Sequence, residues 1–113
     1  RQLLLNGKVI ASCVTQKMMQ FYGATTADLD GIVEQLRVTD GVEMAVLVHE
    51  LEPLVYKVSM RANDKIDVAA IASRFGGGGH VKAAGCTMTG TYYDIMNTLL
   101  ELADIQLNEG KAR

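Results

Sequence analysis

The chain has 113 residues, the size of a single domain, and 49% of them are hydrophobic, which is enough for one buried core without disulfides or metal ions. Lysine and arginine number 11 and aspartate and glutamate 13, and the net charge of −2 argues against a protein that coats long nucleic acids by charge alone. Any anion that the chain binds must therefore meet a small, locally built site.

The cysteines and the apolar runs indicate the compartment. Cys13 and Cys86 lie far apart and lack the spacing of a zinc site, so both are expected to be small core residues in a reducing environment. No apolar run approaches the roughly 18 residues of a membrane span, and no signal sequence opens the chain. We expect a cytoplasmic domain with no membrane partner. Because the chain begins at Arg1 without a methionine, we also expect it to be a segment of a longer protein.

The first third of the chain predicts a hairpin and a helix. The pair Asn6-Gly7 suits the positive φ angles of a two-residue type I′ turn, so residues 2–15 are predicted to form a β-hairpin. Residues 25–38, "TTADLDGIVEQLRV", predict an amphipathic helix with Thr25 or Thr26 as its N-cap. Its support comes from acidic residues in the first turn and apolar residues at helical spacing: Asp28, Asp30, Leu29, Ile32, Val33 and Leu36.

Two strands are predicted in the middle of the chain. Residues 42–50, "VEMAVLVHE", are apolar on both pleat faces at their centre, as expected for an interior strand covered on two sides. In residues 54–62, "LVYKVSMRA", the two faces separate, because side chains alternate along a strand. Lys57, Ser59 and Arg61 then share a polar face, with Arg61 at its end.

A short helix and a third strand follow. Asp67 is expected to cap a helix that runs to Phe75, and Gly76 suits its end in a left-handed conformation. Residues 83–90, "AAGCTMTG", resemble another short strand. A glycine run therefore connects a helix to a strand.

The last predicted element is a helix that opens with Thr91 and Asp94, while residues 108–113 are expected to be frayed. Together these elements predict that residues 1–113 form one α/β domain. Its architecture is one mixed β-sheet of about five strands with flanking helices.

The most unusual stretch is a glycine run directly before a histidine: Gly76, Gly77, Gly78, Gly79 and His80. It fits neither the Walker pattern GxxxxGK[ST] nor the dinucleotide pattern GxGxxG. Without Cβ atoms to keep an anion away, up to four successive backbone amides can form a nest that donates several hydrogen bonds to one phosphate.

Side chains near the run can complete such an anion site. His80 at its edge can donate a hydrogen bond to a phosphate oxygen, and Arg61 is the first candidate for a charged contact, with Lys82 second. Each charge-assisted contact contributes about 1.5–3 kcal/mol, so a few suffice for a short ligand. The alternatives stay open: the run as a flexible connector, His80 as a plain loop histidine and Arg61 as a solvated strand-end charge.

Residues 56–85, "YKVSMRANDKIDVAAIASRFGGGGHVKAAG", resemble the DHH-associated C-terminal domain of the DHH phosphoesterases. Within that superfamily they are most similar to the oligoribonuclease and phosphoadenosine-phosphate (pAp) phosphatase branch, often called nanoRNases. The resemblance covers nearly the whole chain, and GGGGH together with the upstream S-x-R is its specific feature. It implies that the glycine run and His80 contact substrate phosphate or nucleotide, and that Arg61 and Ser59 face them.

The resemblance also implies a division of labour. The parent enzymes hydrolyse phosphoester bonds in short oligoribonucleotides, pAp or dinucleotides, with manganese ions bound by an N-terminal DHH domain. This chain has no Asp-His-His triplet, so by itself it should be inactive and serve its own DHH domain as the part that binds substrate. The preferred nucleotide, the cleavage direction, the identity of the metal and the formation of a homodimer stay open.

Other functions remain in competition at this point. Within the superfamily, the parent is alternatively a cyclic di-AMP phosphodiesterase or a RecJ-like exonuclease. From another class, the chain is a noncatalytic RNA-binding module, because related glycine-rich domains end the alanyl-tRNA synthetases. That alternative predicts binding to structured tRNA with a steep dependence on salt, whereas a dinucleotide site predicts a shallow one.

Overall fold

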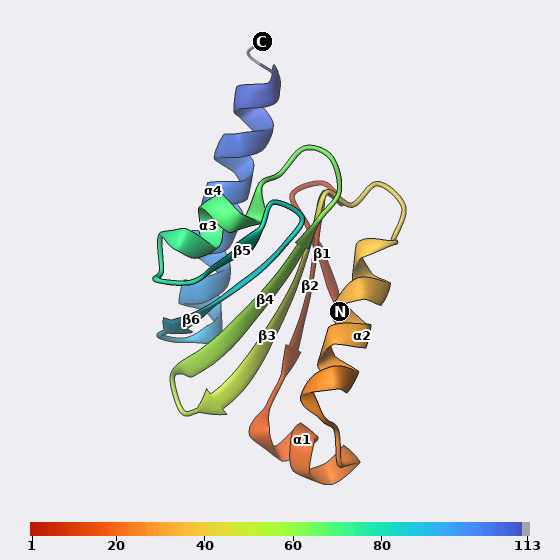
Figure 1. Cartoon of the computed structure of the whole chain (residues 1–113), viewed down its shortest axis with the longest axis vertical. Helices are drawn as coiled ribbons and strands as arrows, with labels where there is room; N and C mark the ends of the chain where they lie inside the picture. The colour runs from red at the N-terminus through yellow and green to blue at the C-terminus, as the bar shows by residue number, and fades with distance from the viewer. Residues whose placement is uncertain (112–113) are drawn as a thin grey trace.

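The computed structural model describes residues 1–111 as one six-stranded sheet with helices on both faces (Figure 1). The strand order is β1-β2-β3-β4-β6-β5. The elements in chain order are β1 (Gln2–Leu4), β2 (Val9–Val14), α1 (Gln16–Tyr22), α2 (Thr26–Arg37), β3 (Met44–Glu52), β4 (Val55–Ala62), α3 (Val68–Ser73), β5 (Gly78–His80), β6 (Ala83–Thr89) and α4 (Tyr92–Lys111). Only β2 and β3 pair in parallel, so the predicted mixed sheet is confirmed, with six strands where about five were expected.

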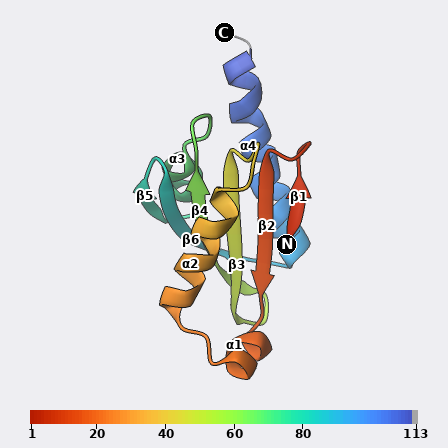
Figure 2. The ribbon, with the colours of Figure 1, turned by 90° about the vertical axis from the view of Figure 1, so that its right-hand side faces the viewer.

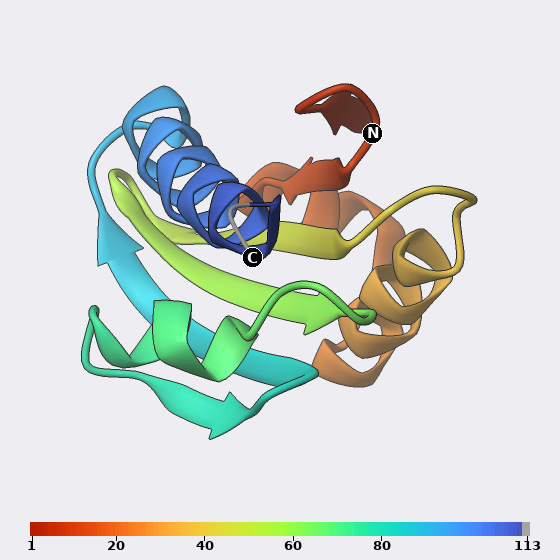
Figure 3. The ribbon, with the colours of Figure 1, turned by 90° about the horizontal axis from the view of Figure 1, so that it is seen from above.

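Three layers build the molecule. The helix α2 connects the parallel strands β2 and β3 and lies across one face of the sheet, as a crossover connection requires (Figure 2). The helices α3 and α4 lie on the opposite face (Figure 3). Because α2 does not reach the edge strand β5, the outer part of the sheet has one covered face and one open face.

The central strand β3 supplies both cores. Met44, Val46 and Val48 join the larger cluster under α3 and α4, while Ala45 and Leu47 join the smaller cluster under α2. All five are buried. The prediction of an interior strand covered on two sides is therefore confirmed.

The turn and cap signals of the first third are also confirmed. Asn6 and Gly7 have φ angles of 56° and 80°, and the tight turn between β1 and β2 closes with a hydrogen bond from the Lys8 amide to the Leu5 carbonyl. Thr25 is the N-cap of α2 and forms a capping box with the third helical residue, whose amide donates to the Thr25 hydroxyl.

The later helices begin where the sequence predicts. The Asp67 side chain accepts a hydrogen bond from the Ala70 amide at the start of α3. At the start of α4, Thr91 and Asp94 exchange hydrogen bonds between side chains and backbone amides. In both cases a short polar side chain satisfies amides that the first turn of a helix leaves without partners.

Three parts of the fold differ from expectation. The hairpin strand ends at Val14, and the unpredicted helix α1 follows it, with none of its residues buried. The strand β5 forms within the glycine run. Residues 108–111 belong to α4, so the predicted frayed tail is wrong there, while residues 112 and 113 lie outside the described part of the chain. None of the helices in residues 1–111 combines the length and apolar character needed to cross a bilayer.

Candidate phosphate-binding face

The glycine run is an ordered edge of the sheet. After α3 ends, Gly76 takes a left-handed φ of 75°, as predicted, and the chain turns back into β5. That strand pairs with β6 in antiparallel register, with Gly78 opposite Gly85 and His80 opposite Ala83. The alternative of a flexible connector is therefore wrong, because the run is held on both sides by regular structure.

The expected nest of four free amides is wrong for the first two glycines. The Gly76 amide donates to the Ser73 carbonyl at 3.3 Å and the Gly77 amide to the Ala72 carbonyl at 3.0 Å, so both close the end of α3. The remaining glycines, Gly78 and Gly79, belong to β5, which is the last strand of the sheet. Free main-chain groups for a ligand are therefore those along the outer edge of this strand.

The glycines serve different purposes. A Cβ on Gly77 would collide with the Gly85 carbonyl oxygen, and a Cβ on Gly79 would lie 2.6 Å from the Ala83 carbonyl oxygen. Both positions therefore need glycine for close packing of β5 on β6. At Gly78 a Cβ would meet nothing within 4 Å, and the φ angle is not left-handed. The packing and the backbone conformation within residues 1–111 give no reason for a glycine at position 78.

The turn between β5 and β6 is anchored on both sides. The Ala62 amide donates to the Lys82 carbonyl and the Val68 amide to the Val81 carbonyl, each at 2.9 Å. The Lys82 ammonium itself lies 3.8 Å from an Asp64 carboxylate oxygen, and both side chains are mostly exposed. The backbone at this turn is therefore well placed, whereas the predicted ligand group of Lys82 is exposed and its ion pair weak.

The strand register brings the predicted polar residues onto one face. Arg61 lies opposite Ala83, which in turn lies opposite His80, so the three form one row across β4, β6 and β5. A second row, two residues further along the strands, consists of Ser59, Gly85 and Gly78. Partners in such rows point to the same side of a sheet, and two strand spacings separate the Arg61 and His80 backbones by about 10 Å.

We call Ser59, Arg61, Gly78 and His80 the open face. The structure brings together these four predicted site residues, with Lys82 in the adjoining turn. The alternation of β4 also places Lys57 on this side, and its Cε lies 3.7 Å from where a Cβ on Gly85 would stand. Lys57 is a further cation on this side that was not among the predicted ligand groups, although the alternation of residues 54–62 already placed it on the polar strand face.

Arg61 is the most constrained member of the open face. Its side chain is only 17% exposed, and its Nη1 donates a hydrogen bond to the Met60 carbonyl at 3.0 Å. On α2, a Glu34 oxygen lies 3.4 Å from Nε and an Asp30 oxygen 4.0 Å from Nη2. Arg61 is therefore not a solvated strand-end charge, and its acidic neighbours are residues that the sequence did not assign to the site.

Two recesses of the molecule, of about 410 Å³ and 330 Å³, lie away from the open face. The larger is lined by the β1–β2 turn, the loop before α3 and the end of α4, and the smaller by β6 and the start of α4. Neither is lined by a residue of the open face.

The described residues do not offer a metal centre. In residues 1–111, no three His, Cys, Asp or Glu side chains cluster closely enough to hold a metal ion. Both cysteines are free thiols, and burial raises the pKa of Cys13 and of Cys86. Each thiol is thus protonated near neutral pH. The prediction of a core residue is confirmed for Cys86, which is buried, and is wrong for Cys13, which is only half-buried.

Two relatives by sequence are named oligoribonucleases, and both are much longer than this chain. Oligoribonuclease NrnB of Bacillus subtilis is 52% identical over 40 residues, which cover 34% of this chain and 10% of that protein. The bifunctional oligoribonuclease and PAP phosphatase NrnA of Thermus thermophilus is 39% identical over 67 residues, which cover 59% of this chain and 20% of that protein. The chain therefore matches only a minor part of each relative.

Solved structures share the fold. An exopolyphosphatase-related protein from Bacteroides fragilis superposes on 97% of this chain and 32% of its own, with a TM-score of 0.82 and 19% identity. The C-Ala domain of Aquifex aeolicus alanyl-tRNA synthetase superposes on 88% of this chain and 90% of its own, with a TM-score of 0.63 and 12% identity. A pGpG-specific phosphodiesterase, PggH of Vibrio cholerae, covers 94% of this chain and 35% of its own, with a TM-score of 0.55 and 11% identity.

The family follows from the sequence itself. Residues 6–109 match the model of the DHHA1 domain, and this span includes both β4 and the glycine strand β5. The predicted resemblance to the DHH-associated domain is therefore confirmed over most of the chain. The chain belongs to the DHHA1 domain family.

Proposed function

We propose that this DHHA1 domain binds the phosphate and terminal nucleotide of a short oligoribonucleotide, pAp or a dinucleotide, as the substrate-binding part of a DHH phosphoesterase. The observation that carries the proposal is the row of Arg61, Ala83 and His80 next to Gly78, a glycine that neither packing nor backbone conformation explains. The names of the sequence relatives, both oligoribonucleases, support a hydrolase parent and a nucleotide substrate.

The chemistry of the open face suits a phosphate. A guanidinium carries five N–H donors in a planar fork, and Arg61 uses one of them for the Met60 carbonyl. A phosphate above β6 would have Arg61 of β4 on one side and His80 of β5 on the other, and the absence of a Cβ at Gly78 leaves room for it. Such charge-assisted contacts contribute about 1.5–3 kcal/mol each, enough to hold a small ligand without a basic surface.

Hydrolysis belongs to another part of the parent in this proposal. The family implies manganese ions in an N-terminal DHH domain, which supply the metal-activated water, and the residues described here do not fit such a centre. The role of this chain is then to bind and orient the end of the substrate, because binding away from the scissile bond positions the reacting group. We expect the 113-residue chain to have no phosphoesterase activity by itself.

The proposal is tested by titrating the chain with pAp in a calorimeter or by NMR. We expect Arg61→Ala to weaken binding about 10- to 100-fold and His80→Ala about 3- to 10-fold. Lys17→Ala is the control, since it removes one exposed positive charge from α1, away from the open face. Equal affinity of the unmodified chain and the three variants for pAp would refute the assigned site. If the chain does not bind pAp, unchanged turnover of pAp by the same variants of the parent enzyme would refute it as well.

A second candidate function is noncatalytic binding to structured RNA. It is favoured by the superposition with the C-Ala domain, which extends over 90% of that domain. A tRNA surface engages many phosphates, so its affinity falls steeply with salt, whereas one nucleotide end engages few. Titrations with tRNA and with pAp at several salt concentrations separate the two: tight tRNA binding with a steep slope, and weak pAp binding, would favour the RNA-binding module.

A further inference from the structure

Behind Arg61 stands a chain of polar side chains that the nucleotide site alone does not explain. Glu34 on α2 places one carboxylate oxygen 3.4 Å from the Arg61 Nε, and its other oxygen accepts a hydrogen bond from the Arg37 Nε at 2.9 Å. One carboxylate thus bridges two guanidinium groups, one on α2 and one on β4.

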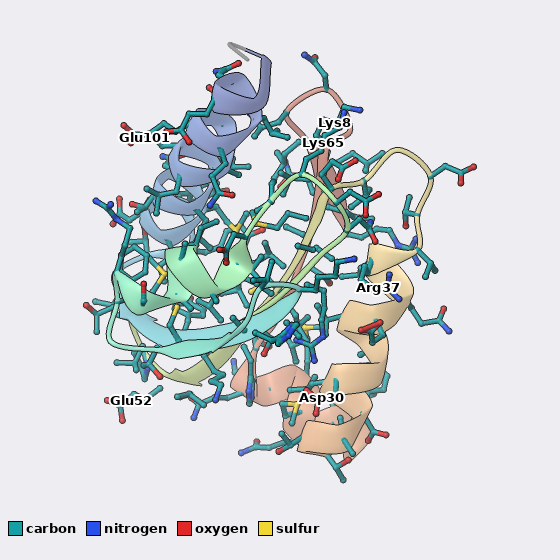
Figure 4. The ribbon with its side chains drawn as sticks, turned by 45° about the horizontal axis from the view of Figure 1, so that its top comes forward. Lys8, Asp30, Arg37, Glu52, Lys65 and Glu101 are labelled. Atoms are coloured by element: carbon teal, nitrogen blue, oxygen red, sulfur yellow. The ribbon has the colours of Figure 1, made fainter. Side chains whose placement is uncertain are left out.

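The far end of this chain is fixed to the backbone. Arg37 Nη1 donates to the Asn63 side-chain oxygen at 3.0 Å. The Asn63 side-chain amide donates in turn to the Arg37 carbonyl at 3.1 Å and the Val42 carbonyl at 2.7 Å. Asn63 directly follows β4. The two ends of the last turn of α2, Glu34 and Arg37, are therefore both connected to the strand that carries Arg61. Figure 4 shows Arg37 and Asp30 along α2, on the other side of the molecule from Glu101 on α4.

We propose that Glu34 is the positioning residue of Arg61: anchored through Arg37 and Asn63, it holds the guanidinium in the orientation in which the open face receives a phosphate. The inference rests on the proposed function for its ligand, but the orientation of Arg61 is a property of the chain alone. Two carboxylates of α2 lie beside the guanidinium, and Glu34 is the nearer, at 3.4 Å from Nε compared with 4.0 Å between Asp30 and Nη2. Without Glu34 the guanidinium keeps only the more distant Asp30 and the Met60 carbonyl, so it is held less tightly.

Orientation and charge predict opposite effects on phosphate binding. A carboxylate beside the site repels an incoming phosphate, so if charge alone mattered, Glu34→Gln would strengthen binding. If Glu34 instead holds the guanidinium ready, the same change weakens binding, because the ligand must then order a long side chain. The sign of the change therefore decides between the two effects. Glu34 itself is about half exposed, so its replacement should leave the fold intact.

The first experiment needs no ligand. The ¹⁵N relaxation of the Arg61 Nε–H group in the chain reports how tightly the guanidinium is held. We expect a lower order parameter in Glu34→Gln and in Arg37→Gln than in the unmodified chain, and no change in Glu101→Gln, which removes one carboxylate from the far side. An Arg61 signal that is equally ordered in all four proteins would overturn the inference, whatever the chain binds.

The second experiment is a double-mutant cycle on pAp affinity. We expect Glu34→Gln to weaken binding about 3- to 10-fold in the unmodified chain and less than about 2-fold in the Arg61→Ala background, because a residue that acts through Arg61 has nothing left to position. Glu101→Gln leaves affinity unchanged in both backgrounds. Stronger binding by Glu34→Gln, or an equal loss in both backgrounds, would overturn the inference while leaving the proposed function standing.

The two proposals fail in different ways. If Arg61→Ala binds pAp as well as the unmodified chain, the nucleotide site is wrong for this chain. The same holds if the chain shows no pAp binding and the same variants of the parent enzyme turn over pAp unchanged. The relaxation of the Arg61 Nε–H group still decides whether Glu34 holds the guanidinium. If Arg61→Ala loses affinity and the cycle is additive, the nucleotide site holds and Glu34 has no positioning role.

Discussion

The two faces of strands β4 and β6 differ sharply in burial and polarity, although successive residues of each strand alternate between them. Under α3 and α4, Val58 and Met60 are completely buried and Cys86 nearly so. One step along the same strand, Ser59 and Arg61 point to the other side, where α2 covers only part of the sheet. A single backbone therefore presents a packed apolar face and a polar face that is only partly covered.

The difference assigns stability and binding to separate sets of side chains. Burying a large apolar side chain contributes roughly 1.5–3 kcal/mol, so the covered face holds the outer strands in place. The open face adds little to that energy and can therefore carry groups chosen for a ligand. Edge strand β5 follows the same alternation: Gly77 and Gly79 are needed for its packing on β6, whereas Gly78, on the side of Ser59, is not.

The largest effect expected from this comparison is on the covered face. Met60→Ala removes a completely buried side chain and leaves a cavity, which should lower the free energy of unfolding by about 2–5 kcal/mol. Ser59→Ala, the neighbouring position on the open face, should cost less than about 1 kcal/mol. Urea denaturation measures both. Equal losses would contradict the division of the strand into a stabilising and a binding face.

The next effect concerns the packing of the glycine strand. A Cβ on Gly77 would collide with the Gly85 carbonyl oxygen and lie 2.6 Å from the Cys86 Cβ, so Gly77→Ala forces β5 away from β6. We expect a loss of about 1–3 kcal/mol in unfolding free energy, as overpacked sites show. Hydrogen exchange of the β5 and β6 amides locates the disturbance. A variant as stable as the unmodified chain would show that this edge is not closely packed.

Much of the fold was predictable because its signals are local. The Asn6-Gly7 turn, the Thr25 and Asp67 caps and the alternation of β4 depend on residues within a few positions of one another. The strand β5 was not predictable in this way, because glycines have no preference for strands. It forms because Gly77 and Gly79 let β6 approach closely, a contact that only the assembled sheet contains.

The candidate site was predictable in composition but not in arrangement. The polar face of β4 and the glycine run were both apparent, and the register across β6 brings them into neighbouring positions. The carboxylates beside Arg61 were not assigned to the site. Asp30 and Glu34 share a helix face at a spacing of four residues, but which strand lies below them depends on the crossover from β2 to β3.

A smaller effect separates the two kinds of glycine. Gly78→Ala places a methyl group where nothing lies within 4 Å and the backbone conformation is ordinary, so stability should stay the same or rise by up to about 1 kcal/mol. The methyl group nevertheless occupies the open face, and we expect pAp binding to weaken about 3- to 10-fold. Calorimetry measures the affinity for pAp, and urea denaturation measures the free energy of unfolding. Unchanged affinity would remove Gly78 from the proposed site.

The smallest effect is a pH dependence that arises on the covered face. Burial raises the pKa of the Cys86 thiol above its ordinary value of 9.0, and Lys57 opposes this only in part. Above that pH the unfolded chain loses the thiol proton while the folded chain keeps it, so the stability present below pH 9 falls as pH rises toward the folded pKa. The loss is at most about 1.4 kcal/mol for each pH unit between the two pKa values.

Unfolding free energies between pH 8 and about 10 should therefore fall more steeply for the unmodified chain than for Cys86→Ala. An equal dependence of the unfolding free energy on pH in the two proteins would mean that burial on the covered face does not disfavour the thiolate.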